Sequence, residues 1–243
     1  MSGTRLSKLM AERGLCSRRE ADRFIEQGWV KVDGKRIDTL GVKVDPGCKI
    51  ALAKQAQRRQ QFLATFLLNK PIGYVSGAAE RRYRTAMSLL EPKYRASIDR
   101  SRIPYRTCHR NKLAPAGRLD IESQGLIVYT QDGRIARHLI GPDSEVEKEY
   151  VVRITGGLQA DTLERLCFGL TLDDKPLKPA RVEIVNEDQL RFVLIEGRKR
   201  QIRRMCDAVG LTVTGLKRVR IGDVRLAGLP EKTWRYLTPG ERF

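Results

Sequence analysis

Histidine is scarce in this sequence of 243 residues. Only His109 and His138 occur, and neither has a second metal-binding side chain at a useful spacing. Histidine-based acid–base catalysis and a histidine metal site are therefore hard to build. The glycine patterns GxGxxG and GxxxxGKS/T are missing too, so the sequence contains no loop of the kind that holds the phosphates of a nucleotide. We expect no metal, no nucleotide cofactor and no other cofactor.

Paired cysteines and long hydrophobic runs are also missing. The five cysteines are scattered without a CxxC pair, which argues against a disulfide framework or a cysteine zinc site and favours a reducing compartment. The longest apolar run, residues 62–68, is far too short to span a bilayer. Residues 1–14 carry charges and lack the apolar centre of a signal peptide. We therefore expect a cytoplasmic protein with no membrane partner, and a monomer by default.

Acidic residues are few relative to basic ones. The chain has 47 Lys and Arg against 29 Asp and Glu, a net charge of +18. The excess is concentrated early: residues 1–62 carry 14 basic and 7 acidic groups, and residues 63–120 carry 12 and 4. A field of this strength attracts polyanions, of which nucleic acid is the commonest in cells. A membrane-surface protein can be equally basic, but the sequence has no long amphipathic basic helix. The charge indicates nucleic-acid binding.

Residues 1–52 predict a compact unit of two short helices and a small sheet. Apolar residues at helical spacing precede Gly14, a plausible helix stop. Residues 17–20, Ser-Arg-Arg-Glu, form a capping box that opens a second helix, and Asp33-Gly34 predicts a hairpin turn. The basic residues of this unit form either a solvated surface or, as their concentration favours, an RNA-docking face. The candidates for RNA binding are Arg5, Arg18, Arg19 and Arg23.

A polar stretch without periodicity, residues 53–62, predicts a linker, and a larger domain follows at residues 63–243. Buried strands are predicted in this domain at residues 62–68, 126–130, 151–154 and 191–195. Helices are expected at residues 134–140 and after a second capping box at residues 161–164. Strands separated by loops and a few helices indicate the α+β class, with a mixed, mainly antiparallel sheet.

The strongest candidate for catalysis is Asp120, in the sequence Gly-Arg-Leu-Asp that leads into an apolar strand. In an arbitrary protein, an aspartate at such a place more often caps a turn. A second feature shifts this balance: residues 198–204 hold five basic side chains in a helical pattern. They could contact phosphates only, or one arginine could turn inward and keep a buried carboxylate ionised. His109, in a basic loop, is either an RNA contact or without a role, and His138 is expected to be structural or exposed.

These residues carry a family resemblance that covers nearly the whole chain. Residues 117–126 (GRLDIESQGL), 148–150 (KEY) and 196–206 (EGRKRQIRRMC) are similar to the three signature motifs of the RsuA/RluB/RluE/RluF family of ribosomal RNA pseudouridine synthases. Residues 67–76 (LLNKPIGYVS) resemble the opening strand of that family's catalytic domain, and residues 4–50 resemble its S4 RNA-binding domain. The resemblance implies an S4-like domain followed by a pseudouridine synthase domain that isomerises a uridine in ribosomal RNA.

The resemblance also implies roles for individual residues. Asp120 matches the family's catalytic aspartate, which attacks covalently or stabilises positive charge on the ribose. Tyr150 matches the tyrosine that stacks beneath the target base and removes the proton from C5, although a core tyrosine on a strand is the ordinary alternative. Arg203 matches the arginine that pairs with the aspartate, with Arg204 beside it as the other possible register. Arg118 matches an arginine that fills the gap left by the flipped nucleotide. The nucleotide must flip out because its glycosidic carbon is inaccessible within a helix.

The remaining basic residues of the third motif, Lys199 and Arg200, are expected to contact RNA phosphates. Residues 201–206 and 234–237 are most similar to the RluF-like branch, which favours 23S over 16S ribosomal RNA as the substrate. One departure from the family pattern is a longer, basic stretch before the GRLD motif, near residues 98–114. Two alternatives are a non-catalytic S4-type RNA-binding or ribosome-assembly factor and an RNA methyltransferase. Neither explains the presence of all three candidate catalytic residues, and a methyltransferase would need a glycine-rich cofactor loop.

Overall fold

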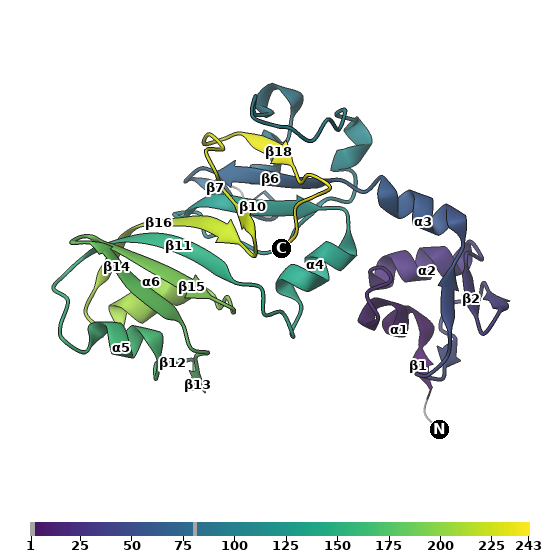
Figure 1. Ribbon diagram of the computed structural model, residues 1–243, viewed down its shortest axis with the longest axis horizontal. Helices are drawn as coiled ribbons and strands as arrows, with labels where there is room; N and C mark the ends of the chain where they lie inside the picture. The colour runs from purple at the N-terminus through teal and green to yellow at the C-terminus, as the bar shows by residue number, and fades with distance from the viewer. Residues whose placement is uncertain (1–2, 80–81) are drawn as a thin grey trace.

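The computed structural model describes residues 3–79 and 82–243 (Figure 1). Its first part is a small unit in which two helices pack on short strands around one apolar core. The elements are β1 (Thr4–Arg5), α1 (Leu6–Glu12), α2 (Arg18–Glu26), β2 (Val30–Val32), β3 (Lys35–Ile37), β4 (Lys43–Val44) and β5 (Ile50–Leu52). We call these elements together the S4-like unit.

Local sequence signals account for the turns of this unit. The predicted capping box is present: the Glu20 backbone N–H donates to the Ser17 hydroxyl oxygen at 3.3 Å, and the Ser17 N–H donates to the Glu20 carboxylate at 3.1 Å. After α1 the chain turns at Gly14, whose φ of 68° suits a residue without a Cβ. The hairpin between β2 and β3 turns at Asp33 and Gly34, both with positive φ, as a type I′ turn requires.

The polar stretch 53–62, predicted as a linker from its lack of periodicity, is helical over most of its length as α3 (Lys54–Gln61). Its role as a linker stays a prediction. Ala56 is fully buried in the core of the S4-like unit, and the Ala53 N–H donates to the Trp29 carbonyl at 2.8 Å. Arginine and glutamine are good helix formers, and the Gln60 side chain also donates to the Leu15 carbonyl at 2.7 Å. The helix therefore extends the S4-like unit toward the larger domain.

The larger domain is built on one sheet of nine strands, with seven in the order β14-β15-β11-β16-β10-β6-β18 (Figure 1). Only β10 and β16 pair in parallel, and every other described pairing in this sheet is antiparallel. The strands are β6 (Thr65–Lys70), β9 (Ala114–Pro115), β10 (Gln124–Thr130), β11 (Lys148–Thr155), β14 (Arg181–Asn186), β15 (Gln189–Leu194), β16 (Thr212–Ile221), β17 (Val224–Arg225) and β18 (Trp234–Tyr236). The predicted α+β class and mixed, mainly antiparallel sheet are confirmed.

Apolar clusters lie on both faces of the sheet. Side chains alternate between the two faces along its central strands, so β6 and β10 each contribute to both clusters. Leu67, Leu126 and Val128 join Leu139 of α4 (Gly133–Ile140) in one apolar cluster. Phe66, Leu68, Ile127 and Tyr129 face the other way, into a larger cluster that includes α5 (Thr162–Cys167) and α6 (Gln201–Asp207). These two clusters contain only residues after 63, whereas the cluster of the S4-like unit ends at Ala56. The proposed domain division at residues 52 and 63 stays a prediction.

The second predicted capping box, at residues 161–164, is not formed. Asp161 precedes α5 but makes no side-chain cap, because its backbone (φ −92°, ψ −4°) lacks the extended conformation that an N-cap needs. The Thr162 hydroxyl instead accepts a hydrogen bond from the Gln159 N–H at 2.9 Å. None of the described helices is both long enough and apolar enough to cross a membrane.

Short elements fill the connection between β6 and β9. They are β7 (Tyr74–Val75), β8 (Arg84–Thr85) and three single turns of 3₁₀ helix, η1 (Ala86–Leu89), η2 (Pro92–Tyr94) and η3 (Thr107–Arg110). A further small hairpin, β12 (Thr171–Leu172) with β13 (Lys175–Pro176), lies after α5. Residues 82–113 are thus arranged in turns and short elements rather than in long helices or strands.

Candidate active site

Asp120 lies half-buried in the loop that joins β9 to β10. The residue before it is held on both sides by Ser76: the Leu119 N–H donates to the Ser76 hydroxyl at 2.9 Å, and this hydroxyl donates to the Leu119 carbonyl at 2.6 Å. The Ser123 N–H donates to the Asp120 carbonyl at 3.0 Å, and the Gly73 N–H to the carbonyl of the residue after Asp120 at 2.8 Å. The backbone of Asp120 is therefore fixed from both directions.

A buried lysine that was not predicted as a site residue contacts this loop. Lys70, at the end of β6, is fully buried, and its ammonium donates to the carbonyls of Pro71 (2.9 Å) and Ser123 (2.8 Å). Burial lowers the pKa of this ammonium to about 8; the charge of Asp120 opposes this decrease, and the charge of Arg218 adds to it. Lys70 and Asp120 are thus electrostatically coupled.

Tyr150 faces the same cleft from β11. It is 8% exposed and sits at a β-bulge, where the pairing with β16 shifts between Glu149 and Tyr150. A bulge re-aims a side chain and is common beside active sites. The guanidinium carbon of Arg218 lies 5.9 Å from the centre of the Tyr150 ring. Arg218 is 3% exposed and donates through Nε to the Leu126 carbonyl at 2.7 Å, while its Nη2 is buried without a hydrogen-bond partner.

Arg203 is buried on α6 and points toward the Asp120 loop, but its partners lie two residues beyond Asp120. Its Nε is 3.7 Å from the Glu122 carboxylate, and Nη2 donates to the Glu122 carbonyl at 3.4 Å. A third contact runs from Nη1 to the Val213 carbonyl at 3.1 Å. Within residues 3–79 and 82–243, no hydrogen bond or ion pair joins Arg203 to Asp120. The predicted pairing of these two side chains stays a prediction.

The basic neighbours of Arg203 point elsewhere. Arg204 makes two hydrogen bonds, of 2.9 and 2.8 Å, to the Asp173 carboxylate on the outer side of the helix. It is therefore not placed to pair with Asp120. Arg200 precedes the helix in a left-handed conformation (φ 53°), is exposed, and pairs with Glu122 at 3.1 Å. Lys199 is exposed beside it, as a phosphate contact would require.

These side chains surround a cleft of about 1350 Å³. Its charged lining residues, as far as the structure describes them, are eight basic and two acidic. They are Arg118, Lys148, Lys178, Arg198, Lys199, Arg200, Arg203 and Arg218, with Asp120 and Glu196. Such a lining attracts a polyanion, and it includes Asp120 and Tyr150 together with the arginines. Arg118 is exposed at this surface, and its predicted role in filling the gap of a flipped nucleotide stays a prediction.

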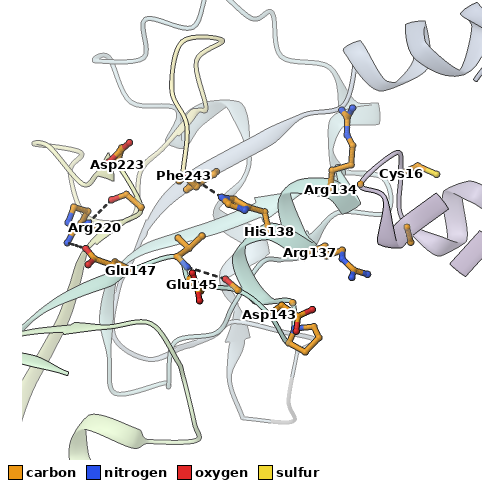
Figure 2. Close-up of a pocket in the computed structure, with 17 residues that line it drawn as sticks. Cys16, Arg134, Arg137, His138, Asp143, Glu145, Glu147, Arg220, Asp223 and Phe243 are labelled. Carbon is orange, nitrogen blue, oxygen red and sulfur yellow. Dashed lines mark hydrogen bonds and ion pairs between the residues drawn. The ribbon is translucent and has the colours of Figure 1, made fainter. Parts of the chain in front are cut away.

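A second hollow, of about 770 Å³, lies between the S4-like unit and α4 (Figure 2). Figure 2 shows Cys16 on one side of it and Arg134, Arg137 and His138 on the other. Acidic and basic side chains are balanced here. The lining holds the arginines Arg134, Arg137 and Arg220 and the acids Asp143, Glu145, Glu147 and Asp223. A balanced lining does not favour a polyanion, so we place the candidate site in the larger cleft.

The predicted RNA contacts of the S4-like unit lie outside the cleft. Arg5, Arg18 and Arg19 are exposed, and Arg23 is half-buried with its Nε donating to the Arg19 carbonyl at 3.2 Å. Their role stays a prediction. A different arginine of the unit, Arg13, donates to the Cys48 carbonyl at 2.6 Å and serves the fold instead.

The two histidines have different outcomes. His109 is buried, and its Nδ1 lies 2.7 Å from the Tyr236 hydroxyl, so the interpretation of this residue as an RNA contact or without a role is wrong. Burial lowers the pKa of His109. His138 is exposed on α4, as predicted, with Nε2 3.1 Å from the Phe243 carbonyl. Among the described residues, no group of three His, Cys, Asp or Glu is placed to hold a metal ion.

Three cations of the site were missed by the sequence reading. Lys148 lies in the KEY motif two residues before Tyr150, and this position was the available signal, whereas Lys70 lies in the motif of residues 67–76 without a candidate catalytic residue beside it. Burial lowers the pKa of Lys148 to about 8, with Arg218 and Lys178 adding to the effect. Arg218 gave no signal, because a buried arginine on a strand looks the same in sequence as an exposed one.

Comparison with known proteins shows the family of the chain. The family model described as RNA pseudouridylate synthase matches residues 64–208, and the S4 domain model matches residues 4–50. The chain is 35% identical over 242 residues to the dual-specificity RNA pseudouridine synthase RluF of Escherichia coli (strain K12), covering 99% of this chain and 77% of the relative. It is 34% identical to the ribosomal large subunit pseudouridine synthase B of Bacillus subtilis (strain 168), covering 98% and 93%.

A solved structure leads to the same assignment. The crystal structure of a pseudouridylate synthase superposes with a TM-score of 0.64 at 28% identity and covers 96% of both chains. The matching family model spans more than half of this chain, and the site described above lies within it or directly after it. The chain belongs to the RNA pseudouridine synthases and joins an S4 domain to the catalytic domain of that family.

Proposed function

We propose that this protein converts a specific uridine of ribosomal RNA, in 23S rather than 16S RNA, to pseudouridine, with Asp120 as the catalytic carboxylate. The observation that carries the proposal is the placement of Asp120 in a cleft with eight basic side chains and only one other acid among its described lining residues. The relatives support the substrate, since one of them is a ribosomal large subunit pseudouridine synthase. A ribosomal RNA substrate implies a cytoplasmic protein.

The reaction needs a carboxylate rather than a redox group. The bond between N1 of uracil and C1′ of ribose breaks, and a bond between C5 and C1′ forms. The proton leaves C5 and N1 gains one, so atoms and electrons balance within the nucleotide. Asp120 either attacks covalently or stabilises the positive charge that develops on the ribose. A carboxylate can take either role only where it is well positioned, and the two hydrogen bonds between Ser76 and the Leu119 backbone hold the chain next to Asp120.

Tyr150 and Arg203 complete the proposed mechanism. Tyr150 presents its ring to the cleft beside Asp120, where it stacks beneath the flipped uracil and removes the C5 proton in the last step. Arg203 holds the Asp120 loop through the carbonyl and carboxylate of Glu122 and brings a buried positive charge to the same end of the cleft. We therefore propose Arg203 as a positioning residue for Asp120.

The RNA is held by charge outside the reacting centre. Arg118 lies exposed at the cleft, and in this proposal it enters the helix from which the nucleotide has flipped. Lys199 and Arg200 meet phosphates at the rim, and Arg5, Arg18, Arg19 and Arg23 of the S4-like unit bind a more distant part of the RNA.

The test is a cofactor-free assay with uridine-containing ribosomal RNA. Wild-type protein should form pseudouridine, and Asp120→Asn should form none while it binds RNA with unchanged affinity, because asparagine keeps the shape and loses the charge. Glu187→Gln is the matched control, since it removes an exposed carboxylate that follows β14, outside the cleft. Residual activity of Asp120→Asn within about a hundredfold of wild type would remove Asp120 from this role.

The choice of 23S over 16S RNA needs a separate measurement. Pseudouridines should be mapped in both RNAs from a strain that lacks this protein. One missing site in 23S RNA is expected. A missing site in 16S RNA alone would contradict the substrate assignment and leave the reaction itself untouched.

A further inference from the structure

The segment 98–114, which precedes the Asp120 loop, exposes an unusual amount of positive charge. It contains five basic residues, Arg100, Arg102, Arg106, Arg110 and Lys112, and all five are exposed. Its one acid, Asp99, pairs with Arg95 at 2.8 Å and accepts the Ser101 N–H at 2.8 Å, so it is not available to the exposed arginines. Among the residues that the structure describes, the five basic side chains make one ion pair, a contact of 4.0 Å between Arg110 and Glu91.

The backbone of this segment is nevertheless held firmly. The Gln131 side chain donates to the carbonyls of Cys108 (2.9 Å) and Asn111 (2.7 Å), and His109 contacts the Tyr236 hydroxyl at 2.7 Å. Arg102 and Lys112 have φ angles of 57° and 55°, a conformation that costs free energy in residues other than glycine. These contacts fix the backbone, while the charged ends of the side chains remain in solvent. The segment therefore presents its charges in a defined arrangement, which a mobile loop would not do.

One set of hydrogen bonds joins this segment to the residues after α3, and another joins α3 to the S4-like unit. Besides its two contacts to the segment, Gln131 accepts the Ala64 N–H at 3.0 Å, just after α3. Within α3, Gln60 donates to the Leu15 carbonyl at 2.7 Å and accepts from Arg134 at 3.3 Å. In Figure 1 the segment lies above the start of β6, next to the end of α3. The exposed arginines of α3 are Arg58 and Arg59. In the sequence they lie between the basic residues of the S4-like unit and those of segment 98–114.

We propose that segment 98–114 is a second RNA-docking arm, which binds the phosphate backbone of the substrate RNA next to the S4-like unit. Together with α3 the two form one basic track along the end of the sheet where β6 begins and β10 ends. Asp120 lies at the opposite end of β10. The track therefore orients the RNA without touching the reacting nucleotide. The inference rests on the proposed function for the identity of the RNA.

The test uses the full chain with Arg100→Gln, Arg106→Gln and Arg110→Gln combined. The three side chains are exposed, so their loss should leave the fold intact. Binding to protein-free ribosomal RNA should be measured by filter binding at several salt concentrations. Each lost phosphate contact lowers the slope of log K against log salt by roughly 0.7 to 0.9, so a decrease of about two and a roughly 20- to 100-fold weaker affinity at 0.15 M salt are expected.

A matched control separates local contacts from overall charge. The control variant also loses three positive charges, through Arg153→Gln, Arg181→Gln and Arg191→Gln. These exposed residues lie on β11, β14 and β15, in the half of the sheet that is opposite to β18. The long-range attraction between protein and RNA decreases equally in both triple variants. Only the variant in segment 98–114 also loses contacts between the proposed track and RNA phosphates. The control should keep the wild-type slope and bind within about threefold of wild type.

A slope decrease of less than about one in the segment variant, or equal decreases in both variants, overturns the proposal. Pseudouridine formation at saturating RNA is measured in the same preparations and should match wild type, because the segment lies away from Asp120. If wild-type protein formed no pseudouridine, the proposed function would fail, while the salt slopes would still decide whether segment 98–114 binds RNA.

Discussion

Lys70 is a fully buried cation at the end of β6, held by the carbonyls of Pro71 and Ser123 and coupled to Asp120. Its pKa falls from an ordinary 10.5 to about 8, mainly through burial. A lysine with a lowered pKa in the folded state binds its proton less tightly there than in the unfolded chain. The free energy of unfolding attributable to Lys70 is therefore constant below pH 8 and rises with pH between about 8 and 10.5.

The size of this rise follows from the two pKa values. Between pH 7 and pH 10 it amounts to roughly 2.5 kcal/mol as an upper bound. Lys70→Met has no such proton to release. The difference in the free energy of unfolding between wild type and Lys70→Met should shift in favour of wild type by about 2 kcal/mol over this range.

Urea unfolding of both proteins at pH 7, 8, 9 and 10 measures this shift. Lys175→Met, an exposed lysine on β13, is the control and should show no such change. Because the charge of Asp120 raises the pKa of Lys70, Asp120→Asn should move the start of the rise to lower pH. A difference between wild type and Lys70→Met that stays constant from pH 7 to 10 would refute this reasoning.

Two further predictions concern the positioning of the site and of the S4-like unit. Arg203→Met should slow the single-turnover rate by about a hundredfold at nearly unchanged RNA affinity, because the Asp120 loop loses its contacts at Glu122. Arg204→Met should leave this rate unchanged, since Arg204 pairs with Asp173, and equal rates in the two variants would contradict the assignment. Gly133→Val places a Cβ 2.1 Å from that of Ser17, which should separate the S4-like unit from α4 and increase the radius of gyration in small-angle X-ray scattering. Gly157→Val, with open space around it, is the control, and an unchanged scattering curve for Gly133→Val would show that the two units do not pack this way in solution.

Features that depend on neighbouring residues were predictable from the sequence. The capping box at Ser17 and Glu20 and the turn at Asp33-Gly34 require only local spacing, and both are present. The fold class followed from the alternation of strands and helices, and the family from four ordered motifs whose spacing is a property of the chain. The charge excess that indicates RNA binding is likewise a sum over residues and needs no coordinates.

Features that depend on distant partners were decided by the tertiary structure alone. The polar stretch 53–62 becomes a helix because Ala56 finds a place in an existing core. His109 becomes buried because Tyr236, 127 residues later, supplies a hydroxyl. The sequence indicated an inward arginine in the third motif, but only packing against the Asp120 loop gave Arg203 its contacts at Glu122. Burial, partner choice and pKa depend on what surrounds a side chain in space, and sequence spacing within one element does not contain that information.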